Sequence, residues 1–156
     1  MGILNLTPDS FYDGGKYKDE KSILLQVDKM LTDGATFIDV GAYSSRPNAV
    51  NISESEELQR ISPIIELLKA EFPNILLSID TFRSKVAQEC LDRGAAIIND
   101  ISAGNLDDKM MDVVAKNKAP DIIMHMRGTP KNMQSKTDYT DIVLDVPIGA
   151  RMPAPS

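Results

Sequence analysis

Five short apolar stretches of this chain each end on a side chain that can make directed hydrogen bonds. These side chains are Asn5, Asp39, Asp80, the pair Asn99-Asp100, and His125. Carboxylates accept several hydrogen bonds at once, amides both donate and accept, and both supply the oxygen atoms that hard cations prefer. If the stretches are parallel strands, their polar ends meet at one edge of the sheet. The spacing therefore predicts one polar site built from several strand ends.

The elements that must position these residues alternate along the chain. Predicted strands cover Gly2–Asn5, Phe37–Gly41, Ile75–Asp80, Ala96–Ile101 and Asp121–Met126. Because they are apolar on both faces, they are typical of a parallel sheet covered on both sides. Helical patterns separate them, and this alternation predicts a parallel α/β fold.

Apolar residues at helical spacing mark five helices between and after the strands. The first carries Ile23, Leu24, Val27, Met30 and Leu31 and stops at Gly34; the second opens with the capping box Ser53–Glu56 and turns Leu58, Ile61, Ile65 and Leu68 inward. The third carries Val86, Ala87, Cys90 and Leu91, the fourth Leu106, Met110, Met111 and Val114, and the fifth, from about Asp138, carries Tyr139, Ile142, Val143 and Val146. Pro63 predicts a kink or break near Ser62, and Pro147 is expected to stop the fifth helix.

Two architectures suit five such units in 156 residues. One is a five-stranded, doubly wound, flavodoxin-like sheet, and the other is five units of a (β/α)8 barrel. The polar strand ends favour the barrel, since all of them would converge on one face. A receiver-type signalling domain normally has an acidic pair after its first strand, where this chain has Asn5.

Composition excludes several classes of function. Hydrophobic and charged contents of 42% and 26% are those of an ordinary globular protein, and a net charge of −6 argues against nucleic-acid binding. No apolar run approaches the ~18 residues that span a bilayer, so no membrane partner is expected. The single cysteine, Cys90, lies in a helical stripe and is expected to be a buried, inert thiol. The cytoplasm is the expected compartment.

Several segments together resemble one enzyme family. Asn5-Leu6-Thr7-Pro8-Asp9-Ser10-Phe11 resembles the first signature of the dihydropteroate synthases, and residues 34–47 resemble the second. Residues 78–81, 97–101 and 124–130 resemble the ends of the third, fourth and fifth strands of that family. The resemblance covers residues 1 to about 146 and implies a partial pterin-binding TIM barrel over 1–146. Residues 147–156, with three prolines, are expected to form an irregular tail that is disordered or non-native.

The resemblance also implies a reaction and a site. The family condenses 6-hydroxymethyl-7,8-dihydropterin pyrophosphate with p-aminobenzoate to give dihydropteroate and pyrophosphate, depends on Mg²⁺, and is the target of sulfonamides. By resemblance Asp80 and Asn99 contact the pterin, while Ile101 and Met124 line its apolar surroundings. Asp39 and Asp80 are the implied catalytic carboxylates, Asp39 being the one nearest the reacting carbon. Asn5 would reach the metal–pyrophosphate unit, Ser45 and Arg46 the anion, and Phe11 and Pro47 would enclose p-aminobenzoate.

Some features depart from the family or leave alternatives open. Asn48 stands where a glycine is common, and Ala42-Tyr43 replaces a frequent Gly-Glu. The Asp, Lys and Arg-x-His of the family's later strands are not located in this chain, which is expected to be truncated and inactive alone. A full-length member would be a homodimer. The alternatives are a methyltetrahydrofolate-binding methyltransferase domain, an inactive fragment, or a five-unit signalling module.

Overall fold

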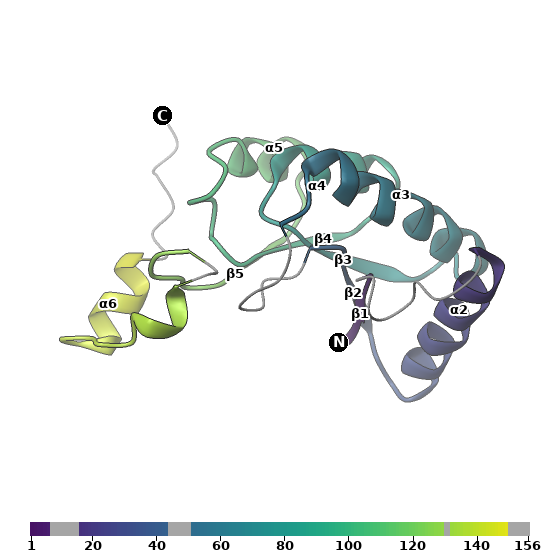
Figure 1. Ribbon diagram of the computed structural model, residues 1–156, viewed down its shortest axis with the longest axis horizontal. Coiled ribbons are helices and arrows are strands. Elements are labelled where there is room, and N and C mark those ends of the chain that lie inside the picture. The colour runs from purple at the N-terminus through teal and green to yellow at the C-terminus, as the bar shows by residue number, and fades with distance from the viewer. Residues whose placement is uncertain (7–15, 44–50, 130–131, 150–156) are drawn as a thin grey trace.

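One parallel sheet organises the molecule (Figure 1). The computed structural model describes residues 1–6, 16–43, 51–129 and 132–149. The strands are β1 (Gly2–Asn5), β2 (Phe37–Gly41), β3 (Leu76–Asp80), β4 (Ile97–Asp100) and β5 (Asp121–Ile123). Every pair is parallel, and the spatial order β1-β2-β3-β4-β5 is the order along the chain. That order confirms the partial barrel and contradicts the flavodoxin-like alternative, in which the strand order reverses.

The helices that follow the strands pack on the same side of the sheet. They are α2 (Lys16–Thr32), α3 (Glu54–Glu71), α4 (Ser84–Asp92) and α5 (Met110–Asn117), and each contacts the next. In Figure 1, α3, α4 and α5 lie along the upper side of the sheet. The 3-10 helix η1 (Met133–Ser135) and α6 (Ile142–Gly149) lie apart from them, beyond β5. Helices on one side are the arrangement found outside a barrel.

The core lies between these helices and one face of the strands. Its strand residues are Leu4, Ile38, Val40, Leu77, Ile79 and Ile98, which pack against Ile23, Val27, Ile61, Ile65, Leu68 and others. The opposite face, the open face, is covered only in part: Asp39 and Ser78 are buried on it, whereas Ile3, Leu76 and Ile122 are 60%, 40% and 43% exposed. The prediction of strands covered on both faces is therefore wrong here, since the described helices shield only one of them.

Helix α3 runs through Pro63 as one helix, so of the predicted kink or break the break is wrong. Proline removes only the hydrogen bond that its own nitrogen would donate to the carbonyl of Gln59. Ile61 and Ile65, on either side of it, are fully buried, and their packing holds both halves of the helix to the sheet. The predicted start is confirmed: Ser53 caps the helix and its Oγ accepts the backbone N–H of Glu56 at 3.1 Å.

Helix α6 begins later than expected and does not stop at Pro147. Asp141 sets its start, because the Oδ1 atom accepts the N–H groups of Val143 and Leu144 at 3.0 and 3.2 Å. The helix continues to Gly149, so the predicted stop is wrong; a proline past the first turn costs a helix one hydrogen bond and need not end it. Residues 150–156 of the predicted tail lie outside the described residues.

The other boundaries differ from prediction by a few residues. Helix α5 starts at Met110, which leaves Leu106 outside it. Strand β5 ends at Ile123, although the N–H of Met124 still donates to the carbonyl of Asp100 at 3.2 Å. None of the described helices is long and apolar enough to cross a membrane.

Candidate active site at the strand ends

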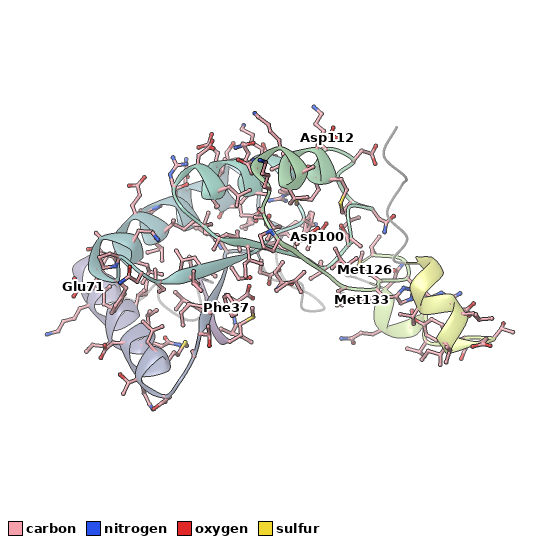
Figure 2. The ribbon with its side chains drawn as sticks, turned by 180° about the vertical axis from the view of Figure 1, so that it is seen from behind. Phe37, Glu71, Asp100, Asp112, Met126 and Met133 are labelled. Atoms are coloured by element: carbon pink, nitrogen blue, oxygen red, sulfur yellow. The ribbon has the colours of Figure 1, made fainter. Side chains whose placement is uncertain are left out.

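Strand register places the predicted polar residues in one row across the open face. Asn5 is paired with Gly41, Gly41 with Asp80, and Asp80 with Asn99. Paired residues of neighbouring strands project to the same side of a sheet. Asn5, Gly41 and Asp80 are the last residues of their strands, and Asn99 directly precedes Asp100, the last residue of β4, which is labelled in Figure 2. The convergence predicted from the sequence is therefore confirmed for Asn5, Asp80 and Asn99.

Glycine at position 41 makes room for the carboxylate beside it. A Cβ atom at this position would lie 3.2 Å from both the Cβ and the Oδ2 of Asp80. Any larger residue would push against Asp80 or cover it. Asp80 can thus face the open side of the sheet with no side chain between it and Asn5 along this row.

The second row of the open face fixes Asp39. Ser78, its register partner on β3, donates from Oγ to Asp39 Oδ1 at 2.6 Å, and Asn99 donates from Nδ2 to Asp39 Oδ2 at 3.2 Å. Asp39 is only 5% exposed. Both oxygens are therefore occupied and the carboxylate is held in one orientation. The same contact turns the amide nitrogen of Asn99 toward β2.

Asp80 is a partly buried carboxylate in a negative environment. Burial, followed by the charges of Asp39, Glu57 and Asp100, raises its pKa from 3.8 to about 7. In the described part of the chain no hydrogen bond or ion pair involves its side chain. A ligand that presents N–H donors to this carboxylate would favour its ionised form.

Asp100 builds the turn after β4 and is not available to a ligand. Its Oδ1 accepts the N–H and the hydroxyl of Ser102, each at 2.8 Å, and its Oδ2 accepts the N–H of Gly104 at 2.7 Å. The turn holds Ala103 at a positive φ of 51°. Ile101 starts this turn and is partly exposed, and Met124 is 39% exposed beyond β5. Ile101 and Met124, which were expected to form the apolar surroundings of the pterin, therefore lie next to the row.

A buried ion pair behind β3 was not predicted. Glu57 is fully buried; its Oε1 accepts the hydroxyl of Thr81 at 2.8 Å and its Oε2 accepts Nη1 of Arg83 at 2.5 Å. The signal was present in the sequence, because Glu57 continues the stripe of Ile61, Ile65 and Leu68 at helical spacing. A charged residue in an apolar stripe requires a partner.

Other sequence-derived expectations divide into three groups. Cys90 is at 0% exposure, which confirms the predicted burial, and burial raises the pKa of its thiol to about 12, which favours an inert thiol. His125 contacts the hydroxyl of Tyr139 through Nε2 at 3.1 Å, a structural contact. Phe11, Ser45, Arg46 and Pro47 lie outside the described residues.

The metal expectation concerns Asn5, which is exposed at the end of the row. In the described ranges no three His, Cys, Asp or Glu side chains come together as a metal site. A single amide oxygen suits an ion that keeps most of its waters or is held by a diphosphate, as Mg²⁺ commonly is. Among the described residues, the donor set is thus compatible with Mg²⁺ delivered with a substrate.

Comparison with known proteins identifies the relatives of this chain. Residues 1–152 match the family described as pterin binding enzyme. The folic acid synthesis protein fol1 of Pneumocystis carinii is 50% identical over 149 residues, which cover 95% of this chain and 20% of that protein.

Solved structures that resemble this chain come from the same family of enzymes. A sulfonamide complex of the dihydropteroate synthase of Yersinia pestis matches with a TM-score of 0.81 at 43% identity, over 93% of this chain and 52% of the other. The dihydropteroate synthase of Clostridium difficile, solved in the presence of pteroic acid, matches with a TM-score of 0.84 at 36% identity, over 96% and 54%. The chain therefore spans about half the length of these enzymes, and its five units correspond to part of their TIM barrel.

The sequence match extends over nearly the whole chain, and the structural match includes the sheet on which the polar row lies. Together they establish that the chain belongs to the family of pterin binding enzymes.

Proposed function

We propose that this protein acts in dihydropteroate synthesis, in which the amine of p-aminobenzoate displaces pyrophosphate from the exocyclic methylene of dihydropterin pyrophosphate. The observation that carries the proposal is the pairing of Asp80 with Asn99 on the open face, next to the space left by Gly41. The relatives named above add support, although the chain covers only about half of the bacterial enzymes.

In this proposal, Asp80 and Asn99 of the row recognise the pterin. A pterin presents adjacent N–H groups on its 2-amino-4-oxo edge, and a carboxylate can accept two of them at once. Asp80 is partly buried, has no described cation beside it, and has a pKa raised to about 7 by burial and neighbouring carboxylates. Pterin N–H donors would stabilise its ionised form. The amide of Asn99 suits the mixed donor and acceptor groups next to that edge, and Ile101 and Met124 would contact the ring.

Charge develops as the substitution proceeds. The bond from carbon to the leaving diphosphate oxygen breaks, the bond from the amine nitrogen to that carbon forms, and the amine loses a proton. Positive charge builds on the pterin, and Asp39, held by Ser78 and Asn99, would stabilise it. Because both Asp39 oxygens already accept hydrogen bonds, its role is electrostatic stabilisation by an oriented carboxylate.

Residues toward the leaving group complete the proposal. Asn5 would hold Mg²⁺, which supplies positive charge to the departing diphosphate when bound. Ser45 and Arg46 would contact the anion, and Phe11 and Pro47 would shield p-aminobenzoate from water. We also propose that the protein works in the cytoplasm and that a full-length member forms a homodimer.

Two substitutions test the recognition step in the whole protein. Asp80→Ala and Asn99→Ala should each weaken binding of the bare pterin by about 1.5–3 kcal/mol, the cost of losing a charged or buried hydrogen bond. Calorimetry measures this, and Asp112→Ala, on the exposed surface of α5, is the matched control. Unchanged pterin affinity in both folded variants would contradict the assignment.

A further inference from the structure

We propose that Ser78 is a positioning residue for pterin recognition: it holds Asp39, and Asp39 fixes which way round the side-chain amide of Asn99 faces a ligand. The proposal rests on the proposed function for the identity of that ligand. It adds to the electrostatic role proposed for Asp39 a role in binding, before any charge develops on the pterin. No role for Ser78 was expected from the sequence.

The hydrogen bond between Asn99 and Asp39 crosses the central strand of the sheet. Strand β3 lies between β2 and β4, and Asn99 on β4 donates from Nδ2 to Asp39 Oδ2 on β2 at 3.2 Å. Strands on either side of a common neighbour are about 10 Å apart, so both side chains must lean over β3 to meet. Asn99 shares a row with Asp80, and Asp39 shares a row with Ser78. The bond therefore runs diagonally across β3, between Asp80 and Ser78.

Ser78 holds the acceptor of this bond. It is 0% exposed, and its Oγ donates to Asp39 Oδ1 at 2.6 Å. Asp39 is 5% exposed, so its oxygens depend on protein donors for their hydrogen bonds. With one oxygen bound to the hydroxyl of Ser78, the other stays directed at Asn99.

The carboxylate decides the direction of the amide. An ionised carboxylate accepts hydrogen bonds and donates none, so Asn99 must meet it with Nδ2 and not with Oδ1. The carbonyl and the second N–H of that amide are then left in one fixed order. Among the described contacts, no hydrogen bond involves Oδ1 of Asn99. An amide without this bond could make a half turn and exchange the two groups.

Two related pteridines report this order. Lumazine carries an oxygen at C2, where a pterin carries an amino group, so the donors and acceptors along that edge differ. An amide held in one direction distinguishes the two ligands, because the mismatched one leaves polar groups unpaired. An amide that can turn accommodates either. The ratio of the two affinities therefore reports the orientation of Asn99, whereas a general loss of stability weakens both ligands alike.

The experiment measures binding of bare pterin and of lumazine to the whole protein by calorimetry. Asp39→Asn keeps the shape of the side chain but offers one oxygen and one nitrogen, so Asn99 can face either way. Ser78→Ala removes the donor that holds Asp39. We expect the wild type to prefer pterin, and each variant to lower the ratio of affinities by at least about fivefold, the effect of one hydrogen bond.

Ser102→Ala is the matched control. Ser102 is 1% exposed and donates from Oγ to Asp100 Oδ1 at 2.8 Å, so the variant also loses a buried bond between a serine and an aspartate. Because Asp100 holds a turn and not Asn99, the melting temperature should fall as in Ser78→Ala while the ratio of affinities stays unchanged. In an Asn99→Ala background, Asp39→Asn should also leave the ratio unchanged, since no amide remains to be oriented.

The outcomes separate orientation from mere stability. A wild-type ratio in folded Ser78→Ala or Asp39→Asn, or an equal fall in the ratio in the Asn99→Ala background, would overturn the proposal. If the wild type binds neither pteridine, the proposed function fails instead.

The orientation can then be tested without a ligand. The side-chain amide signals of Asn99 in heteronuclear NMR, identified by their absence from Asn99→Ala, should move in Ser78→Ala and stay in place in Ser102→Ala. Signals that do not move in Ser78→Ala would refute the positioning role.

Discussion

At the scale of single residues, Asp80 brings function and stability into conflict. Its pKa in the folded protein is raised to about 7, mainly by burial and then by Asp39, Glu57 and Asp100. Between its ordinary value of 3.8 and about 7, the folded state keeps a proton that the unfolded state releases. Stability contributed by the neutral form is therefore lost as pH rises through this window. A site that must present an ionised carboxylate to a ligand is destabilised when the ligand is absent.

Asp80→Asn should remove that conflict. The amide cannot ionise, so the variant should exceed the wild type in free energy of unfolding by about 1–3 kcal/mol at pH 8. The difference should shrink toward zero near pH 4. Urea denaturation at the two pH values measures it, with Asp112→Asn as a surface control. An equal difference at both pH values would show that Asp80 titrates normally.

The same row bears on the proposed binding of Mg²⁺. The described residues offer Mg²⁺ only isolated oxygen donors such as Asn5, with no carboxylate cluster around them. Magnesium should therefore bind weakly alone and at least tenfold more tightly with pyrophosphate present, because the diphosphate supplies most of the ligands. Titration calorimetry with and without pyrophosphate checks this. Tight binding of Mg²⁺ alone that resists mild chelation would contradict it.

At the scale of elements, the alternation of strands and helices and the strand-end residues could be predicted from the sequence. The contacts that orient them could not. Ser78 and Asp39 are 39 positions apart and meet only through the register of β2 on β3, while Glu57 and Thr81 meet across α3 and β3. Periodicity predicts that a strand exists, but register depends on the packing of the whole sheet.

The wrong predictions at Pro63 and Pro147 have a related cause. Local rules assign Pro63 a kink or a break, yet helix α3 does not break there, because tertiary packing on both sides of the proline outweighs one lost hydrogen bond. The helix caps were predicted only where the capping residue is adjacent. The N–H of Ser84 at the start of α4 is instead capped by Asp107 Oδ2 at 2.7 Å, from 23 residues away.

The end of α5 offers a local test of backbone strain. Lys118 caps it in the left-handed conformation, at φ 51°, which costs an L-residue more than it costs glycine. Lys118→Gly should raise the free energy of unfolding by about 0.5–1 kcal/mol. Lys116→Gly, inside the same helix, should lower it by about 1 kcal/mol. Thermal denaturation compares the two, and a loss of stability at both sites would refute the strain.

At the scale of the molecule, helices cover one face of the sheet, and the other face is the open face. Ile3, Leu76 and Ile122 are exposed on the open side, and β1 and β5 each have only one strand neighbour among the described residues. Apolar surface beside unpaired strand edges promotes association.

Residues 1–156 expressed by themselves should therefore self-associate or bind ANS, and should form no detectable dihydropteroate. Size-exclusion chromatography and a thermal melt followed with ANS measure this. A compact monomer with a cooperative melt would contradict the interpretation of the open face as a barrel interior. Product formation would instead show that these residues suffice for catalysis.

The order β1-β2-β3-β4-β5 has a consequence for how the protein is made. Each strand docks beside the strand that left the ribosome just before it, and its helix packs against the preceding helix. Few contacts must wait for a distant part of the chain, so loop-closure entropy stays low at every step. The helix-side core can grow one unit at a time during synthesis. The polar row, which joins β1 to β4, is then assembled on the growing sheet when the fourth strand docks.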